Sequence, residues 1–356
     1  MDSVRSKFLW RGDEDTFKYH MVKWDNVFFP KDFGGMGVIN TRRMNEALLS
    51  KWIWRIIKNR ENDACVKLLR SKYLNSKPFS LSSTKGGSQF WTGIQKVKHI
   101  FNWGAAFEVR SGKETLFWKD VWLYKAPLKL VFPKIFDYCR NKNSLVSECM
   151  IDGQWQFDFT RTFGPEEVQE WEELLTKLFD INLGLEEDMV TWKLEKNGHF
   201  TTRSLYRWLS FRGVKNKRAE KIWRSKLPMK IKVFMWPANQ NRLPTKTKMK
   251  ERKWKGEQGC RNCGALESLD HILFTCILAR FTWSCLKEAL GWDRIPNSWW
   301  DFLEVWLPTG ATDYQLKLFI FPFLFWGLWT TRNKSSIEGV FPTTEPLFKT
   351  LSYLQK

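Results

Sequence analysis

The amino-terminal part of the chain has apolar residues that recur with the period of an amphipathic helix. Within Met44–Lys58 they fall three or four positions apart, and Asn40 or Thr41 can cap the start of that helix. Further helices are predicted over Ala64–Leu74 and Ser88–Phe101 by the same period.

Two stretches replace this helical period with alternation, which is typical of strands. Phe107 and Val109 alternate with charged residues, and a Ser111-Gly112 turn followed by Thr115–Trp118 predicts a β-hairpin. A second hairpin is predicted around the Asn197-Gly198 turn.

Helical patterns return in the carboxy-terminal half, while the proline-bearing Lys125–Pro133 reads as a loop. The helices are predicted from Pro165, from Thr201 or Thr202 to Leu209, over Lys230–Trp236, from Arg242 toward Trp254, and over Leu318–Trp329. The predicted fold class is therefore α+β, mostly helical with short β-hairpins.

Charge is distributed unevenly along the 356 residues, whose formal net charge is +20. The segment Arg203–Lys255 holds 18 basic and 2 acidic residues, whereas Glu166–Glu195 holds 10 acidic and 2 basic ones. This reversal predicts a boundary and a localised basic face suited to a polyanion such as RNA or DNA. The alternative is an ordinary solvated, lysine-rich surface.

The most specific chemical pattern is the spacing C-x2-C-x7-H-x4-C. It is formed by Cys260, Cys263, His271 and Cys276, and two thiolates, an imidazole and a third thiolate can surround one Zn²⁺ as a tetrahedron. Because protein atoms then fill every position, the zinc is predicted to be single and structural, in a small zinc-stapled helical module near the C-terminus. The alternative is that these residues are unrelated reduced cysteines and a surface histidine that bind no metal.

Catalytic readings find little support in the sequence. The acidic clusters Asp13–Asp15 and Glu186–Asp188 occur in turn-like sequence and are read as solvated. No His-x-Glu precedes a Pro-Cys-x-x-Cys, and no Gly-x-Ser-x-Gly occurs, so zinc-deaminase and serine-hydrolase patterns are absent. No catalytic residue is assigned.

The candidate nucleic-acid contacts lie in the basic segment that precedes the cysteines. They are Lys230, Lys232, Arg242, Lys246, Lys248, Lys250, Arg252, Lys253, Trp254 and Lys255. Most of the 22 tryptophans occupy positions expected to be buried, but Trp254 lies between two lysines and is expected to stack on a base.

The amino-terminal residues are polar and basic, without an apolar signal segment, and the apolar run Leu318–Trp329 is too short to span a bilayer. A nuclear or cytosolic location is expected, with no membrane partner. The oligomeric state is not predicted.

Several blocks together resemble the region downstream of the polymerase palm in plant LINE-type (non-LTR) retrotransposon reverse transcriptases, ending in the reverse-transcriptase zinc-binding domain. They are Lys7–Gly12, Phe33–Thr41, Ala47–Ile53, Gly112–Leu123, Gly198–Tyr206, Leu227–Thr245 and the zinc knuckle-like cysteine cluster with Glu267-Ser268. The resemblance covers most of residues 7–335.

The resemblance implies four parts. They are residues 1–150 downstream of the palm, an acidic helix and hairpin strand at 151–197, the zinc-binding domain at 198–291, and a helical tail at 292–356 that ends before any ribonuclease H domain. It also implies that the four predicted ligands hold the metal. Pro237 departs from the family pattern, and no Tyr-x-Asp-Asp polymerase motif occurs.

The expected function is that of a non-catalytic, zinc-binding and nucleic-acid-binding fragment of a retrotransposon polyprotein. The missing polymerase part of the same element is a further expected partner. The alternative is a structural relic or a protein-interaction module that binds no nucleic acid. A catalytic zinc enzyme would need an open coordination position.

Overall fold

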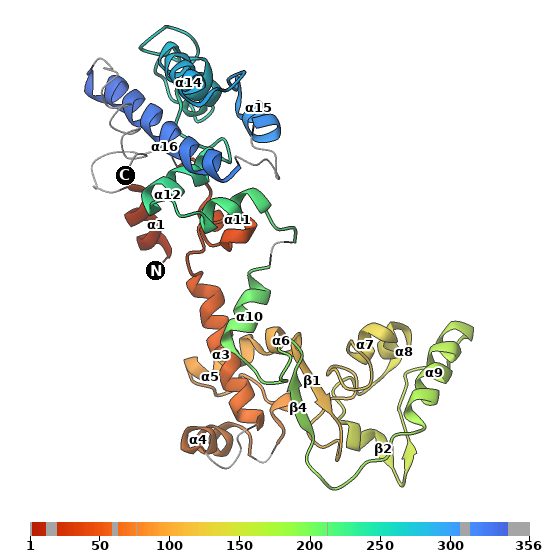
Figure 1. Ribbon diagram of the computed structural model, residues 1–356. Coiled ribbons are helices and arrows are strands. Elements are labelled where there is room, and N and C mark those ends of the chain that lie inside the picture. Colours follow the sequence, from red (N-terminus) through yellow and green to blue (C-terminus); the bar gives the residue numbers. More distant parts are fainter. Residues whose placement is uncertain are drawn as a thin grey trace. The chain divides into compact units, whose positions relative to one another are not determined.

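The computed structural model describes residues 2–11, 20–58, 63–75, 77–211, 213–306 and 314–340. Its internal contacts divide the chain into two compact units (Figure 1). Unit 1 combines Met1–Ile39 with Arg212–Lys356, and unit 2 is the continuous stretch Asn40–Phe211. The predicted acidic cluster Asp13–Asp15 lies outside the described residues, and the predicted division into four parts stays a prediction.

Unit 2 is built on the long helix α3 (Thr41–Lys58), which confirms the helix predicted from the apolar period. Its buried face, with Ala47, Ile53 and Ile56, packs in one core with Trp91. The other helices of unit 2 are α4 (Ala64–Tyr73), α5 (Gln89–Lys96), α6 (Lys98–Asn102), α7 (Leu128–Val131), α8 (Pro133–Tyr138), α9 (Pro165–Leu178) and α10 (Thr202–Leu209), with short 3-10 turns η2 (Phe79–Leu81) and η3 (Val146–Cys149).

Capping accounts for several of these boundaries. The Asp63 carboxylate accepts hydrogen bonds from the first turn of α4, and the Thr201 hydroxyl accepts one from Ser204 N at the start of α10. The single helix predicted over Ser88–Phe101 is two helices, because the backbone leaves the helical conformation at Val97. The predicted loop Lys125–Pro133 contains α7.

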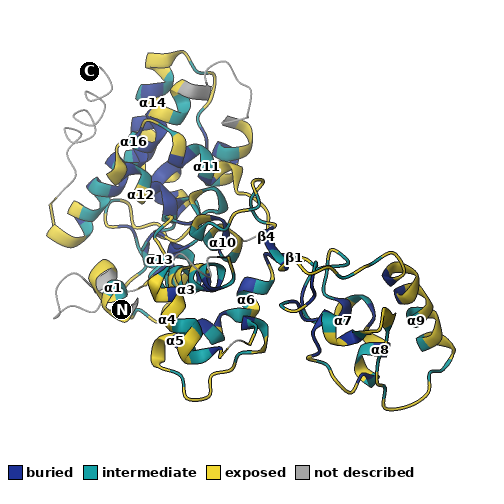
Figure 2. Ribbon diagram, turned by 90° about the horizontal axis from the view of Figure 1, so that it is seen from below, coloured by how far each residue is buried: buried dark blue, intermediate teal, exposed yellow. Residues whose placement is uncertain are grey.

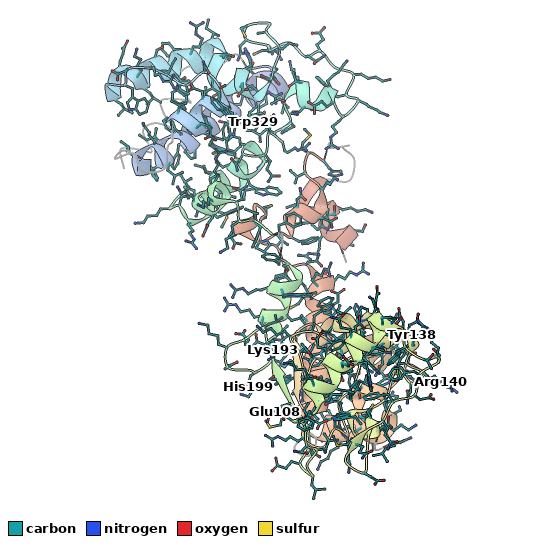
Figure 3. The ribbon with its side chains drawn as sticks, turned by 90° about the vertical axis from the view of Figure 1, so that its right-hand side faces the viewer. Glu108, Tyr138, Arg140, Lys193, His199 and Trp329 are labelled. Carbon is teal, nitrogen blue, oxygen red and sulfur yellow. The ribbon has the colours of Figure 1, made fainter. Side chains whose placement is uncertain are left out.

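The two predicted hairpins are wrong in their pairing. β1 (Ala105–Glu108) pairs antiparallel with β4 (Met189–Trp192), with Ala105 opposite Trp192. Figure 3 labels Glu108, Lys193 and His199 near this sheet. A smaller pair joins β2 (Met150–Ile151) to β3 (Gln154–Trp155). The predicted pairing was wrong because it was inferred from nearby turn residues, whereas β1 pairs with β4 more than 80 positions away.

Asp188 explains why the stretch after β1 does not form the first predicted hairpin. This residue was predicted to be solvated. Its side chain is 8% exposed, and its carboxylate accepts hydrogen bonds from the backbone N–H groups of Arg110, Gly112 and Glu114 and from the Thr115 hydroxyl. The loop after β1 is thus held around a carboxylate beside β4 and does not return as a strand. Asp188 is structural, and Glu186 and Glu187 remain exposed.

A second cluster of apolar residues fills the part of unit 2 around α7, α8 and α9. Phe117, Trp118, Leu174 and Leu178 are fully buried in it. Helix α9 begins at Pro165, and the Glu167 carboxylate accepts a hydrogen bond from Gly164 N, as expected for a helix with acidic residues in its first turn.

Unit 1 has a core of aromatic and aliphatic side chains around α12 (Met229–Ala238), α14 (Ile277–Leu290) and α16 (Tyr314–Asn333). Figure 2 shows the buried faces of these helices, and Figure 3 labels Trp329 on α16. The other elements of unit 1 are α1 (Asp2–Arg11), α2 (Trp24–Val27), η1 (Lys31–Phe33), α11 (Lys217–Arg224), α13 (Lys246–Lys250), η4 (His271–Thr275), α15 (Trp299–Asp301), η5 (Phe302–Trp306) and η6 (Lys334–Glu338).

The glycine-rich stretch after η1 joins the amino-terminal segment of unit 1 to its helices. Gly34 has a φ of 86°, which favours glycine, and its carbonyl accepts a hydrogen bond of 2.7 Å from Trp236 Nε1. Val22, Val27, Trp223 and Trp236 form a small core at this junction.

Pro237 does not break α12. It lies one residue before the end of the helix, and the buried side chains of Ile231, Phe234 and Met235 keep their places in the core. The predicted fold class, α+β and mostly helical with short antiparallel strands, is confirmed. Among the described helices, none has the length and apolar character needed to cross a membrane.

Candidate metal centre and nucleic-acid interface

The four predicted metal ligands converge in unit 1. One ligand atom from each of Cys260, Cys263, His271 and Cys276 lies within 4.8 Å of the others. The Cys260 and Cys276 sulfurs are 3.9 Å apart, and Cys263 Sγ is 3.3 Å from His271 Nε2. Tetrahedral Zn²⁺ with ordinary bond lengths places two sulfurs about 3.8 Å apart and a sulfur and a nitrogen about 3.5 Å apart. The donor set therefore fits zinc.

Local backbone geometry shapes the cluster. Gly264 N donates to Cys260 O and Cys260 N donates to Ala265 O, while Gly264 takes a φ of 77°. These bonds form the tight turn that brings the first two cysteines together. The π-helical turn η4 and a hydrogen bond from Cys276 N to His271 O place the other two ligands.

The surroundings of the ligands favour a thiolate at Cys260 and a defined imidazole tautomer at His271. The pKa of the Cys260 thiol is lowered, first by its hydrogen bond with the Cys276 thiol. His271 Nδ1 lies 3.4 Å from Thr275 Oγ1, so that nitrogen can donate to the hydroxyl while Nε2 faces the metal. Cys260, His271 and Cys276 are buried.

Comparison with known proteins agrees with this geometry. Residues 200–283, which contain all four ligands, match the family described as zinc-binding in reverse transcriptase. This segment is a reverse-transcriptase zinc-binding domain. The cluster suits one zinc ion of the structural kind, because four protein atoms would fill its coordination positions.

Two relatives come from Arabidopsis thaliana. The protein named "Putative ribonuclease H protein" is 26% identical over 287 residues, which are 78% of this chain and 45% of that protein. The "Uncharacterized mitochondrial protein" is 29% identical over 125 residues, which are 35% of this chain and 80% of that protein. The chain thus spans less than half of the first relative. No solved structure matches it significantly. The resemblance to the zinc-binding region of plant reverse transcriptases is confirmed.

A buried ion pair anchors the zinc-binding domain to α16. Glu267 is fully buried, and its Oε1 accepts hydrogen bonds from the Arg332 guanidinium and from Lys246 N. At the tip of the knuckle, Arg261 donates to Ser335 O. No pattern in the sequence indicated that Glu267 and Arg332, which are 65 positions apart, would form a pair.

The predicted basic contacts fall into two groups. Lys232 Nζ donates to Trp223 O, Lys246 Nζ donates to Gly259 O, and Lys248 pairs with Glu251, so these three side chains hold the domain together. The other predicted cations are exposed: Lys230, Arg242, Lys250, Arg252, Lys253 and Lys255. The exposed set is the better candidate for phosphate contacts.

Two exposed cations share a hollow with a residue that sequence reasoning missed. Arg242 and Arg252 line a cavity of about 290 Å³ together with Lys23, and Asn26 and Gln240 also face it. In the part of the chain that the structure describes, no carboxylate lines this hollow. Lys23 was not predicted because it lies about 220 positions before Arg242 in the sequence, outside the basic segment.

Trp254 is partly buried, and its indole lies against the backbone of Gly256. A Cβ atom added to Gly256 would come within 2.1 Å of the ring. One face of the indole is therefore occupied inside the domain. Its predicted stacking on a base stays a prediction.

Proposed function

We propose that the chain binds RNA or DNA through its zinc-binding domain, as a non-catalytic part of a LINE-type (non-LTR) retrotransposon reverse transcriptase. The observation that carries the proposal is the hollow that Lys23, Arg242 and Arg252 line, with no carboxylate among the described residues around it. Three cations in one concave site favour the phosphates of a polyanion.

The zinc supports this function by folding the domain. Metal binding contributes on the order of 10 kcal/mol in small zinc modules. It fixes the knuckle to which Lys246 donates, and α13 with its neighbouring cations begins at that residue. A fully protein-filled coordination shell offers no position for a reacting water.

The test is the salt dependence of affinity for single-stranded and duplex oligonucleotides, measured with the full zinc-loaded chain. About five phosphate contacts give a slope of log affinity against log salt near −3.5 for a single strand. Arg242→Gln with Arg252→Gln is expected to weaken the slope by about 1 to 2. A wild-type slope near zero for both nucleic acids contradicts the proposal.

The alternative of a purely structural or protein-interaction module rests on Lys232 and Lys246, whose ammonium groups donate to carbonyls of the domain itself. Because Lys246 is needed for the fold, its reversal would not separate the two functions. Charge reversal at Lys250 and Arg252, which are exposed, does so. Unchanged nucleic-acid binding in that variant favours the structural module.

A further inference from the structure

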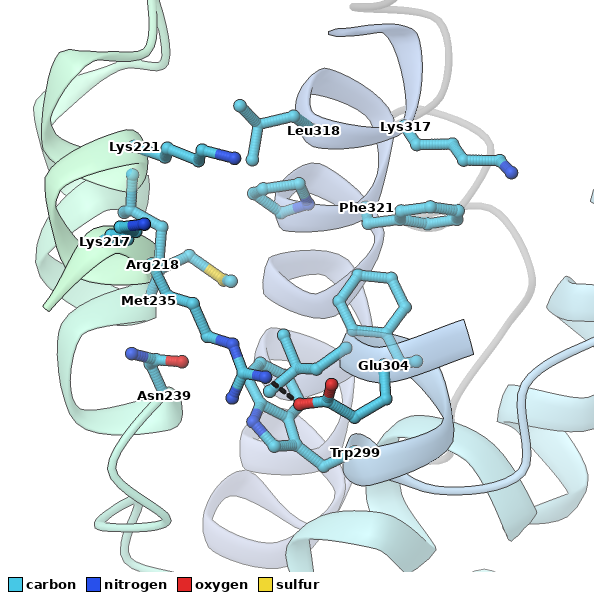
Figure 4. Close-up of a pocket in the computed structure, with 14 residues that line it drawn as sticks. Lys217, Arg218, Lys221, Met235, Asn239, Trp299, Glu304, Lys317, Leu318 and Phe321 are labelled. Atoms are coloured by element: carbon cyan, nitrogen blue, oxygen red, sulfur yellow. Dashed lines mark hydrogen bonds and ion pairs between the residues drawn. The ribbon is translucent and has the colours of Figure 1, made fainter. Parts of the chain in front are cut away.

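A second hollow in unit 1 has a different character from the cationic one. It lies between α11 and α12 on one side and α16 on the other, with a volume of about 330 Å³ (Figure 4). Ile222, Met235, Leu318 and Phe321 form apolar walls, and Trp299 contributes an aromatic surface. Such a mixture of flat and aliphatic groups suits the face of a planar ring.

Positive charge surrounds this hollow. Lys217, Arg218, Lys221 and Lys317 line it, and among the described residues around it Glu304 supplies the one carboxylate. Arg218 reaches across the hollow and pairs with Glu304, and Lys221 points from α11 toward α16 (Figure 4). The site therefore carries a net positive charge, which favours an anionic ligand.

Two polar groups at the hollow lack partners among the described residues. The Asn239 carboxamide lines it without a hydrogen bond, and Trp299 Nε1 is buried without an acceptor. A buried N–H left unpaired is unfavourable. Asn239 offers both donors and an acceptor, as the edge of a nucleobase requires.

We propose that this hollow receives one unstacked base of a single-stranded nucleic acid, while Lys217, Arg218 and Lys221 contact the adjoining phosphates. The inference rests on the proposed function and deepens it, because it names single strands as the preferred partner. The bases of a duplex are stacked and paired, so they cannot enter a hollow between helices. An acidic peptide would satisfy the charge but has no ring edge to pair with Asn239.

Glu304 competes with the ligand for Arg218. When a phosphate arrives, the guanidinium exchanges a carboxylate for a phosphate oxygen, and both form charge-assisted hydrogen bonds. Glu304→Gln weakens the internal competitor and keeps the shape of the side chain. It is expected to raise the affinity for single strands by about two- to fivefold.

The experiment measures fluorescence anisotropy of three labelled probes with the full zinc-loaded chain. They are an oligothymidylate, the same backbone with abasic sites, and a duplex of equal length. Wild type is expected to bind the oligothymidylate at least about fivefold more tightly than the abasic strand, since one stacked base contributes about 1–3 kcal/mol.

Leu318→Trp fills the hollow from a half-buried position and is expected to abolish the preference for bases over abasic sites. Lys217→Gln is expected to weaken single-strand binding more than duplex binding. Lys226→Gln is the matched control, because Lys226 is exposed and does not line the hollow. It should weaken both nucleic acids equally. Zinc content and thermal unfolding check that each variant folds.

The outcomes separate the two proposals. If Leu318→Trp keeps the wild-type preference, or if wild type binds the abasic strand as tightly as the oligothymidylate, the base pocket is overturned. Salt-dependent binding to all three probes would still support the phosphate-binding function. If no probe binds with a salt dependence, the proposed function itself fails and the pocket fails with it.

Discussion

At the scale of single residues, the buried pair Glu267–Arg332 joins the zinc-binding domain to α16. The Glu267 side chain is 0% exposed and that of Arg332 is 11% exposed. A buried pair contributes little over an apolar replacement, but removal of one partner leaves a charge buried and unpaired. Each residue is therefore needed for stability mainly because the other one is buried beside it.

Arg332→Met is expected to lower the free energy of unfolding of unit 1 by about 3–5 kcal/mol, because Glu267 is then unpaired. Chemical denaturation of the zinc-loaded chain measures this change. The control is the double variant Arg332→Met with Glu267→Leu, which should recover most of the loss. If the double variant is as unstable as the sum of the single ones, the pair is not coupled.

A second residue-scale prediction concerns Asp120 in unit 2. Burial raises the pKa of its carboxyl to about 6 from 3.8, although Leu116 N donates to it and Lys98 lies nearby. The folded state thus binds this proton more tightly than the unfolded state does. Stability falls as the pH rises from about 4 to 6, by about 3 kcal/mol in total, and then levels off.

Asp120→Asn should remove this dependence, so that wild type loses stability relative to the variant between pH 4 and 6. Hydrogen exchange of unit 2 amides, corrected for intrinsic rates, measures the difference. A constant difference across that window contradicts the prediction. Lys98 titrates in a different pH range, because burial lowers its pKa to about 8 from 10.5. Its contribution to the free energy of unfolding increases as the pH rises from about 8 to 10.5.

The convergence of the four predicted zinc ligands could be predicted from the sequence, because spacing alone constrains a four-ligand site. Cys260 and Cys263 are brought together by one local turn. The partners of Glu267 and the role of Lys23 could not be predicted, since both depend on residues far away in the sequence. Asp188 was misread because its donors lie more than 70 positions earlier.

At the scale of elements, helices were predicted more reliably than strands. A helix such as α3 satisfies its own backbone, so its apolar period and cap suffice to predict it. A strand needs a partner, and β1 finds one in β4 and not in the adjacent stretch. Of the two nearby turn signals, Asn197-Gly198 lies in a hydrogen-bonded turn, whereas the backbone at Gly112 bonds to Asp188, and neither signal joins two paired strands of the described chain.

Pro237 offers a test of how much one element tolerates. A proline inside a helix costs about 3 kcal/mol, but Pro237 lies in the last turn of α12. Only the bond to the Val233 carbonyl is lost, and Val233 is 38% exposed, near water. Pro237→Ala is therefore expected to change the free energy of unfolding by no more than about 1 kcal/mol. Denaturant unfolding measures it, and a gain near 3 kcal/mol would show that α12 is strained.

At the scale of the whole molecule, the two units are expected to respond differently to the loss of zinc. A strong chelator should expose amides of unit 1 around the knuckle and in α13 to hydrogen exchange, because metal binding stabilises that fold. Amides of β1 and β4 in unit 2 should keep their protection. Equal loss of protection in both units contradicts this expectation.

Two exposed cysteines provide matched variants for this experiment. Cys263 belongs to the metal cluster, whereas Cys65 lies in α4 of unit 2. Cys263→Ser should reproduce the effect of the chelator in unit 1, while Cys65→Ser should leave zinc content and protection unchanged. Loss of zinc from Cys65→Ser would mean that the metal has another ligand set.

The arrangement of unit 1 also sets an order of events during synthesis. The hydrogen bond from Trp236 to Gly34 joins residues 202 positions apart, and a ribosome adding 5–20 residues per second needs about 10–40 seconds to make that stretch. During this interval Val22 and Val27 lack Trp223 and Trp236, which are their partners in the core. All of unit 2 emerges in the meantime and can fold first. Val22 and Val27 therefore stay without these core partners until Trp236 has been synthesised, which happens after all of unit 2 has been made.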